Sequence, residues 1–350
     1  MSAEVSVVAV GARTPVGLRA ESTAAAVRAG ISRLGQHPTL IGAGGEPLRC
    51  AYDPLLAPTL SCAARMGELA VAALTETLAK LPGGGTPPVP VRLLLALPDA
   101  RPGFGKHEAE AVAGQVRKTA IPGVSRIDVE PILGGHAGAL RALELAAQVV
   151  AQRQSDFCVV GGVDSYFDMP TLRWLDQNRR LAGDGVRGGF SPGEAAGMVA
   201  LMSRTERARR RIPALAIVRS VATGREPRSL ASDEGILGEG LTDVVRRATQ
   251  ALTPPHEIVD DIYCDINAER HRGDEWAFTA LRLPTVLGDA TSYQSAVGSW
   301  GDVGAASGAL GCLLAVQAWR RRYARGPRAL VWASSTDGLR GATVLERAEA

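Results

Sequence analysis

The stretch ILGGHAGALRALELAAQVVAQRQSDFCVVGGV, residues 132–163, decides the fold of this chain. It predicts a tight turn at Gly134 and Gly135, a long helix with apolar residues at helical spacing over 140–150, and a short buried strand over 157–160. Such a turn points the free N–H groups of the helix, and their partial positive charge, at whatever lies above it. Turns of this kind often carry a nucleophile, and the residue in this position is His136.

The composition is that of an ordinary globular protein. The 350 residues are 46% hydrophobic, which is enough to bury one large core or two medium ones. Aromatic residues make up only 4% and glycine is abundant, so we expect helices and strands to pack closely through small side chains, as in layered α/β folds. The formal net charge of +3 is too small to suggest a nucleic-acid partner.

The sequence shows no export signal and no membrane span. Its start lacks a charged segment followed by a long apolar one, and no apolar run reaches about 18 residues, so we expect a cytoplasmic protein. The five cysteines are odd in number, scattered and mostly set in apolar segments, which favours buried thiols over disulfides or a metal site. No CxxC or HExxH spacing occurs, and we expect neither a metal nor a cofactor.

The remaining segments divide into two similar sets. The first set is expected to contain strands over 5–10, 92–97 and 157–160, helices over 18–29, 61–80 and 107–118, a surface loop over 36–58, a helix-prone excursion over 169–184, and a turn leading into a strand over 188–202. After a linker at 203–213, the second set has expected strands over 215–221, 258–266, 329–334 and 342–345, and helices over 241–252, 274–283 and 305–321. We therefore predict two similar α/β halves, 1–205 and 212–350, stacked on each other.

Several segments match one family in the same order along the chain. They are VVAVGARTPVG near the start, SDFCVVGGVDS after the long helix, IVDDIYCDINAERHRGDEWAFTAL, and GDVGAASGALGCLLAV. GGFSPGEAAGMVAL at 188–201 has the closest pattern, with Phe190, Gly193, Glu194 and Gly197 in place. The chain resembles the β-ketoacyl-acyl-carrier-protein synthases, condensing enzymes of the thiolase fold.

The resemblance implies a fold and a mode of assembly. The expected fold is α/β and thiolase-like, with two stacked five-stranded mixed sheets in αβαβα layers. The family pairs through the strand before the nucleophile helix, here near 125–130, which implies a homodimer or a heterodimer with a synthase-like subunit. An acyl carrier protein is a further expected partner.

The nucleophile position of the family falls on His136. Condensation in the family needs a cysteine at the start of this helix to hold the acyl chain, and two histidines that assist decarboxylation and stabilise the enolate. Counting back without gaps from Asp156 and Gly161 leads to His136, and no cysteine lies nearby.

The first family histidine follows an Asn-Ala pair. Here Asn267 and Ala268 are followed by Glu269, and His271 lies within a stretch about three residues shorter than the family pattern. Glu269 therefore stands where the resemblance implies a histidine.

The second histidine precedes a Gly-Ala-Ala turn, which begins here at Gly304. Asp302 or Gly301 takes its place, depending on where a gap of one residue is set. The supporting lysine of the family has no counterpart, since no lysine follows Lys118, and the loop at 334–342 has no phenylalanine. The resemblance thus implies a condensing-enzyme fold with a substituted active site.

Each of these residues also has a structural interpretation. His136 could cap the turn or fill the former pocket rather than act in catalysis. Glu194 lies in a glycine turn and is expected to accept backbone hydrogen bonds. Glu269, His271 and Asp302 could form a buried polar cluster around His136, with acid–base chemistry only if solvent reaches it. The arginines at 204–211 and 320–328 are either solvated or a docking patch for an acidic carrier protein.

Three functions remain open from the sequence. The first is a non-elongating scaffold or partner subunit that lacks the thiol. The second is a repurposed acyltransferase or thioester hydrolase that uses His136 with Glu269 or Asp302. The third is a binding module that holds an acyl chain or a protein partner of another assembly.

Overall fold

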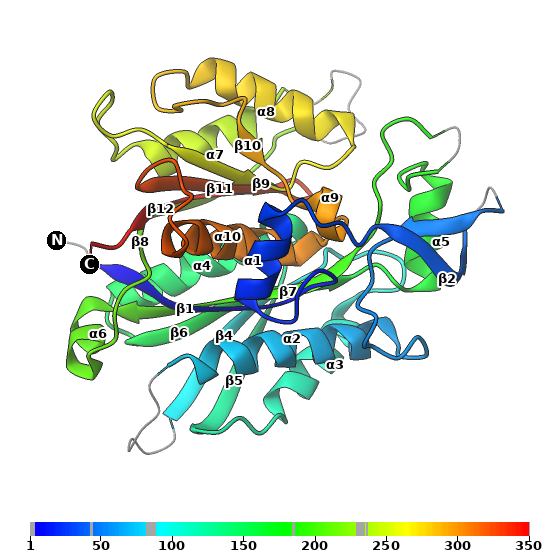
Figure 1. Cartoon of the computed structure of the whole chain (residues 1–350), viewed down its shortest axis with the longest axis horizontal. Helices are drawn as coiled ribbons and strands as arrows, with labels where there is room; N and C mark the ends of the chain where they lie inside the picture. Colours follow the sequence, from blue (N-terminus) through cyan, green and yellow to red (C-terminus); the bar gives the residue numbers. More distant parts are fainter. Residues whose placement is uncertain are drawn as a thin grey trace.

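A ten-stranded mixed sheet organises the described part of the chain (Figure 1). The computed structural model describes residues 4–42, 45–81, 89–183, 186–228, 235 and 237–349. The strand order within this sheet is β10-β9-β11-β12-β8-β1-β7-β6-β4-β5, and a separate two-stranded sheet pairs β2 with β3.

The bounds of the elements up to residue 210 are β1 (Val5–Arg13), α1 (Ala20–Arg28), β2 (Gly35–Ile41), β3 (Pro47–Cys50), α2 (Cys62–Ala79), β4 (Val89–Leu97), α3 (Lys106–Arg117), β5 (Val124–Leu133), α4 (Gly135–Ala151), β6 (Phe157–Ser165), α5 (Met169–Gln177), β7 (Glu194–Ser203) and α6 (Arg204–Arg210). The later elements are β8 (Ala216–Arg225), α7 (Glu239–Thr249), β9 (Asp261–Cys264), α8 (Arg270–Arg282), β10 (Tyr293–Gln294), α9 (Val297–Trp300), the 3₁₀ turn η1 (Gly304–Ala306), α10 (Ser307–Arg320), β11 (Arg328–Ser334) and β12 (Leu339–Arg347).

The sheet repeats one five-stranded pattern twice. In the order β1-β7-β6-β4-β5 the first two pairings are antiparallel and the last two are parallel. The order β8-β12-β11-β9-β10 has the same sequence of directions. Within this repeat α4 and α10 are equivalent, since each leads from the fifth strand of its set back to the third.

The two five-stranded sets are joined, which corrects the expectation of two separate sheets. Strands β1 and β8 pair over Ser6↔Ile217 and Val7↔Ala216, and the Leu215 N–H donates to the Val7 carbonyl at 2.8 Å. This short antiparallel ladder makes the two sets one hydrogen-bonded sheet. The thiolase-like α/β class is confirmed, and we propose 1–205 and 212–350 as the boundaries of the two halves.

The layers place α4 and α10 at the centre (Figure 1). Helices α2 and α3 cover the outer face of one strand set, α7 and α8 cover the other, and α4 and α10 lie between the two sets. Residues 308–319 of α10 are all buried. The first half of α4 is buried too, whereas Arg141, Glu144 and Gln148 of its second half reach the surface.

Two segments differ from their sequence-based expectation. The expected loop over 36–58 contains the hairpin of β2 and β3. Strand β2 is largely exposed and lacks the apolar alternation of a core strand, and β3, which buries Leu48 and Cys50, is only four residues long. The expected linker over 203–213 contains α6, because the Ser203 side chain accepts a hydrogen bond from the Glu206 N–H and caps the helix.

In the described part of the chain, none of the helices combines the length and the apolar character that a membrane crossing requires.

Candidate functional site

The N-termini of α4 and α10 meet at a buried histidine–aspartate pair. The Nε2 atom of His136, in the first turn of α4, lies 2.8 Å and 3.0 Å from the two carboxylate oxygens of Asp302. Asp302 stands just before the turn η1 that leads into α10. Both residues are buried, at 5% and 2% exposure. Gly135 and Gly304 have φ values of +51° and +46°, a conformation that glycine adopts readily, and so allow both sharp helix entries.

Asp302 accepts hydrogen bonds from four different groups. Besides His136, these are the Tyr166 hydroxyl at 2.9 Å, the Asn267 side-chain amide at 2.7 Å and the Gly304 N–H at 2.9 Å. Burial alone would raise the pKa of Asp302, but His136, Arg272 and the Gly304 N–H together hold it well below its usual value. Asp302 is therefore ionised at neutral pH.

The carboxylate of Asp302 determines which ring nitrogen of His136 carries a proton. A carboxylate surrounded by donors requires another donor, so Nε2 carries a proton and donates it to Asp302. The guanidinium of Arg272, whose Nη2 atom lies 3.4 Å from the same Nε2, then faces a second donor and makes no hydrogen bond to it. In the neutral ring, Nδ1 is left as the acceptor of His136.

A serine from the second strand set caps the start of α4. The Ala137 N–H donates to the Ser335 hydroxyl at 2.8 Å, and this hydroxyl donates to the Gly134 carbonyl at 2.6 Å. Ser335 belongs to the loop at 334–342, which stands where the resemblance implies a glycine and phenylalanine loop. The loop thus has a structural function at the helix N-terminus.

Glu269 is held by two arginines. Arg180 donates to both of its carboxylate oxygens, at 2.7 Å and 3.1 Å, and the Arg272 Nε donates at 3.3 Å. Burial raises the pKa of Glu269, but these two guanidinium groups outweigh it and lower the pKa to about 2. Asn267 connects this carboxylate to the histidine–aspartate pair, since its amide also lies 3.2 Å from Glu269.

Arg272 is the buried cation at the centre of this network. Its Nη1 donates to Asp265 and to the Ser334 carbonyl, both at 2.7 Å, and its exposure is 1%. His271 is its neighbour on α8 and is half-buried. Burial and the charge of Arg272 lower the pKa of His271 to about 4, so this histidine is neutral at pH 7.

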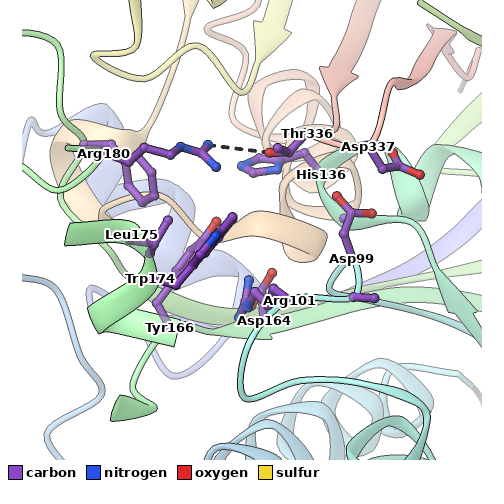
Figure 2. Close-up of a pocket in the computed structure, with 13 residues that line it drawn as sticks. Asp99, Arg101, His136, Asp164, Tyr166, Trp174, Leu175, Arg180, Thr336 and Asp337 are labelled. Atoms are coloured by element: carbon purple, nitrogen blue, oxygen red, sulfur yellow. Dashed lines mark hydrogen bonds and ion pairs between the residues drawn. The ribbon is translucent and has the colours of Figure 1, made fainter. Parts of the chain in front are cut away.

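A cavity of about 170 Å³ reaches His136 from outside. Its walls include Trp174 and Leu175 of α5, Arg180, and Phe190. Figure 2 shows His136 between Arg180 and Trp174 on one side and the carboxyl groups of Asp99 and Asp337 on the other. The Nη2 atom of Arg180 also lies 3.5 Å from the Thr336 hydroxyl, which connects the two strand sets across the cavity (Figure 2).

Asp99 has an unusual environment in this cavity. It follows β4 and packs against Gly135, where an added Cβ atom would lie 2.4 Å from its carboxylate. Burial raises the pKa of Asp99 to about 6, and the charge of Asp337 acts in the same direction. This carboxyl group can exchange a proton near neutral pH.

Of the residues of the GGFSPGEAAG motif, only Phe190 lines the cavity. Phe190 packs against the ring of Tyr166 at a centroid distance of 5.5 Å and lines the cavity. The Gly193 N–H donates to the Asp302 carbonyl at 2.7 Å. Glu194 accepts from the Asp53 N–H at 2.8 Å, as expected for a structural carboxylate, and forms a buried ion pair with Arg65.

Three comparisons with known proteins were made. The sequence matches no protein-family model and no curated protein. The structure matches a ketosynthase from module 6 of the bacillaene synthase of Bacillus subtilis 168, with a TM-score of 0.79 and 14% identity over 99% of this chain and 72% of that one. The chain has the ketosynthase fold.

Two further ketosynthase structures match along their whole length. The ishigamide ketosynthase/chain length factor has a TM-score of 0.71 and 20% identity over 99% of this chain and 100% of that chain. AntDE:AntF, an acyl-carrier protein in complex with its ketosynthase bound to the hexaketide, has a TM-score of 0.76 and 14% identity over the same shares.

Within the ketosynthase fold, the structure brings most of the predicted site residues together. His136, Asp302 and Asn267 are in contact, Glu269 joins them through Asn267 and Arg272, and His271 lies beside Arg272. The carboxylate of Asp302, not Gly301, stands at the histidine.

Sequence reasoning missed the cationic part of the site. Arg272 follows Glu269 by three residues on one helix face, a spacing at which ion pairs form, and this signal could have identified it. Arg180, Tyr166 and Asp99 come from distant segments, and no sequence pattern connects them to His136.

Proposed function

We propose that this chain is a non-elongating relative of the ketosynthases that serves as a scaffold or partner subunit. The observation that carries the proposal is the pairing of His136 with Asp302. The residue at the nucleophile position is an imidazole whose Nε2 is bound to a buried carboxylate. An acyl-imidazole formed there would hydrolyse readily, so it could not hold an acyl chain for condensation.

The cysteines offer no substitute nucleophile. Each cysteine lies outside the lining of the cavity at His136. Burial is the main cause that raises the pKa of every one of these thiols, Cys50, Cys62, Cys158, Cys264 and Cys312. A thiol kept protonated at neutral pH is a poor nucleophile.

The charges around the cavity also oppose condensation. Glu269 and Asp302 stand at the two positions where the resemblance implies neutral histidine donors, and both carboxyl groups have lowered pKa values. Ionised carboxylates repel a developing enolate, and losing one such donor typically costs about 3 kcal/mol of transition-state stabilisation.

The size of the cavity is consistent with this proposal. At about 170 Å³ it is smaller than the roughly 300–1,000 Å³ of most small-molecule sites. A short acyl group or the end of a carrier arm fits this volume better than a long elongated chain.

An assay of carbon dioxide release tests the proposal. The purified protein and its His136→Cys variant are incubated with acyl and malonyl carrier proteins, beside an ordinary ketosynthase as the positive control. Both should remain at the background rate, because the variant restores the thiol but keeps Glu269 and Asp302. Turnover by either protein at a rate near the control would refute the proposal.

The partner we propose is a synthase-like subunit or a second copy of this chain. The β5 edge of the sheet pairs only with β4 within the described chain, so its other side is open for pairing. Among the structural matches, one is a ketosynthase/chain length factor and another is an acyl-carrier protein in complex with its ketosynthase, which supports partners of these two kinds.

A second candidate function is thioester hydrolysis or acyl transfer. The open cavity favours it, because His136 lines this cavity and its Nδ1 is left as an acceptor. Water adding to a thioester carbonyl would give its proton to Nδ1, and the thiol would leave as the acid forms. Hydrolysis of short acyl-pantetheine thioesters that is lost in His136→Ala would support this second function.

A further inference from the structure

A second, basic groove lies far from His136. It has a volume of about 990 Å³, and its lining includes six arginines and three glutamates, a formal charge of +3. The arginines are Arg204, Arg207, Arg219, Arg322, Arg328 and Arg347. The whole chain also has a formal charge of +3, so this groove concentrates a charge that the rest of the surface balances.

The groove and the His136 cavity lie at opposite ends of α4. A neighbouring hollow shares Glu4, Ile217 and Arg219 with the groove and extends to Ala151, the last residue of α4. In Figure 1 α6, the start of β1 and the end of β12 lie on the side of the groove, whereas α5 lies on the opposite side. The 17 residues of α4 correspond to a length of about 25 Å. The groove is therefore not part of the site described above.

Both strand sets build the groove. Arg204 and Arg207 come from α6, Arg219 from β8, Arg328 from β11 and Arg347 from β12. Ala214, Ile217, Trp319 and Pro327 add an apolar part of the lining. The groove thus combines guanidinium groups with an apolar surface.

Acids pair with three of the six arginines of the groove. Glu4 pairs with Arg207 at 3.5 Å, and Glu346 pairs with Arg219 at 2.7 Å and Arg328 at 3.4 Å. Glu257, outside the lining, also pairs with Arg219 at 3.7 Å and with Arg328 at 3.2 Å. The side chains of the other three arginines have no acidic partner among the described residues: Arg204, Arg322 and Arg347.

One buried donor in the groove has no acceptor. The Nε atom of Arg207 is buried and makes no hydrogen bond in the described structure, whereas the buried Nε of Arg328 lies 3.4 Å from the carboxylate of Glu346. An exposed arginine is most often merely solvated, but buried guanidinium donors without an acceptor are rare. This observation separates the groove from an ordinary solvated arginine face.

We propose that this groove binds a small polyanion that carries at least two phosphate groups. The planar guanidinium group matches phosphate oxygens with two parallel hydrogen bonds, and three unpaired cations require more than one negative charge. The volume of the groove lies within the range of ligand sites for small molecules. The proposal is independent of the function assigned to the His136 cavity.

Pyrophosphate is the probe, and isothermal titration calorimetry at 50 mM and 200 mM salt is the measurement. One pyrophosphate should bind per chain with a dissociation constant below about 1 mM at the lower salt, more tightly than inorganic phosphate and more weakly at the higher salt. The triple variant Arg204→Ser, Arg322→Ser, Arg347→Ser should bind at least about tenfold more weakly, since it removes the three unpaired cations.

The matched control removes the same charge elsewhere. Arg33, Arg49 and Arg246 are exposed and have no acidic partner among the described residues, and none of them lines the groove. The triple serine variant of these residues should bind pyrophosphate within twofold of the unchanged protein. An equal loss in both variants, no binding of pyrophosphate, or binding of heparin fragments alone would overturn the proposal.

Discussion

The Nε2 atom of His136 lies 2.8 Å from Oδ1 of Asp302, so the residues at the two positions where the resemblance implies a cysteine and a histidine are paired with each other. Here the histidine faces the acid, and the acid is satisfied by three further donors. The pair therefore acts first on the stability of the fold.

Replacing Asp302 by Asn should destabilise the protein by about 3 kcal/mol at pH 7. The change removes the negative charge that faces Arg272. It also places a side-chain N–H, which is itself a donor, opposite one of the four groups that donate to Asp302. Urea unfolding measures the change in the free energy of unfolding. The exposed Asp274→Asn variant is the control, and its free energy of unfolding should change by less than about 0.5 kcal/mol.

The same pair predicts a pH dependence. The folded pKa of Asp302 is lowered, so its contribution to stability is complete above the unfolded value of 3.8 and is lost as the pH falls below it. The difference between Asp302→Asn and the unchanged protein should stay constant from pH 7 to about pH 5 and shrink below about pH 4. A constant difference down to pH 3 would contradict the assignment.

Replacing Asp99 by Asn should stabilise the protein at alkaline pH. The pKa of Asp99 is raised from 3.8 to about 6, so the folded state loses stability as the pH rises through this range. The variant avoids this loss. Its free energy of unfolding should exceed that of the unchanged protein by about 1–3 kcal/mol at pH 8, and the difference should vanish near pH 4. Thermal unfolding over this range measures it. An advantage independent of pH would show that charge is not its cause.

Glu269→Ala should create a carboxylate site. Glu269 occupies the two guanidinium groups of Arg180 and Arg272, and its removal leaves both without this anion. We expect the variant to bind malonate at least about tenfold more tightly than the unchanged protein in calorimetry. Glu269→Asp keeps the negative charge and is the control, for which little malonate binding is expected.

The chain should form a dimer through the β5 edge. An antiparallel pairing about Asp128 would place Arg126 of each chain opposite Glu130 of the other. Arg126→Glu should weaken the dimer roughly five- to thirtyfold, and the double exchange Arg126→Glu, Glu130→Arg should restore it. Sedimentation equilibrium measures the dissociation constant of the dimer for each variant. A monomer at micromolar concentration, in the absence of a heterologous partner, would contradict the pairing.

The sequence predicted the central elements because their patterns are strong. The apolar spacing of α4 and α10 and the apolar run of β6 follow from the burial of α10, of β6 and of the first half of α4. The hairpin of β2 and β3 and helix α6 were missed. Strand β2 and helix α6 are largely exposed and β3 is only four residues long, so tertiary contacts and a single cap, rather than periodicity, decide their structure.

The site was predicted only in part for a similar reason. His136, Asp302, Asn267 and Glu269 could be placed from the order of motifs along the chain. Arg180 reaches the site because the segment after β6, which contains α5, folds back over the cavity. This tertiary contact cannot be predicted from the spacing of residues along the chain. The pairing of the carboxylates with arginines therefore appears only in the folded chain.

The convergence of α4 and α10 has an evolutionary consequence. Because the two halves repeat one pattern, equivalent helices from both halves direct their positive ends at the same point. A negative group at this point is stabilised whichever half supplies it. A change that moves the acidic side chain from the start of one helix to the start of the other would therefore keep the charge in place, and the fold would survive the exchange.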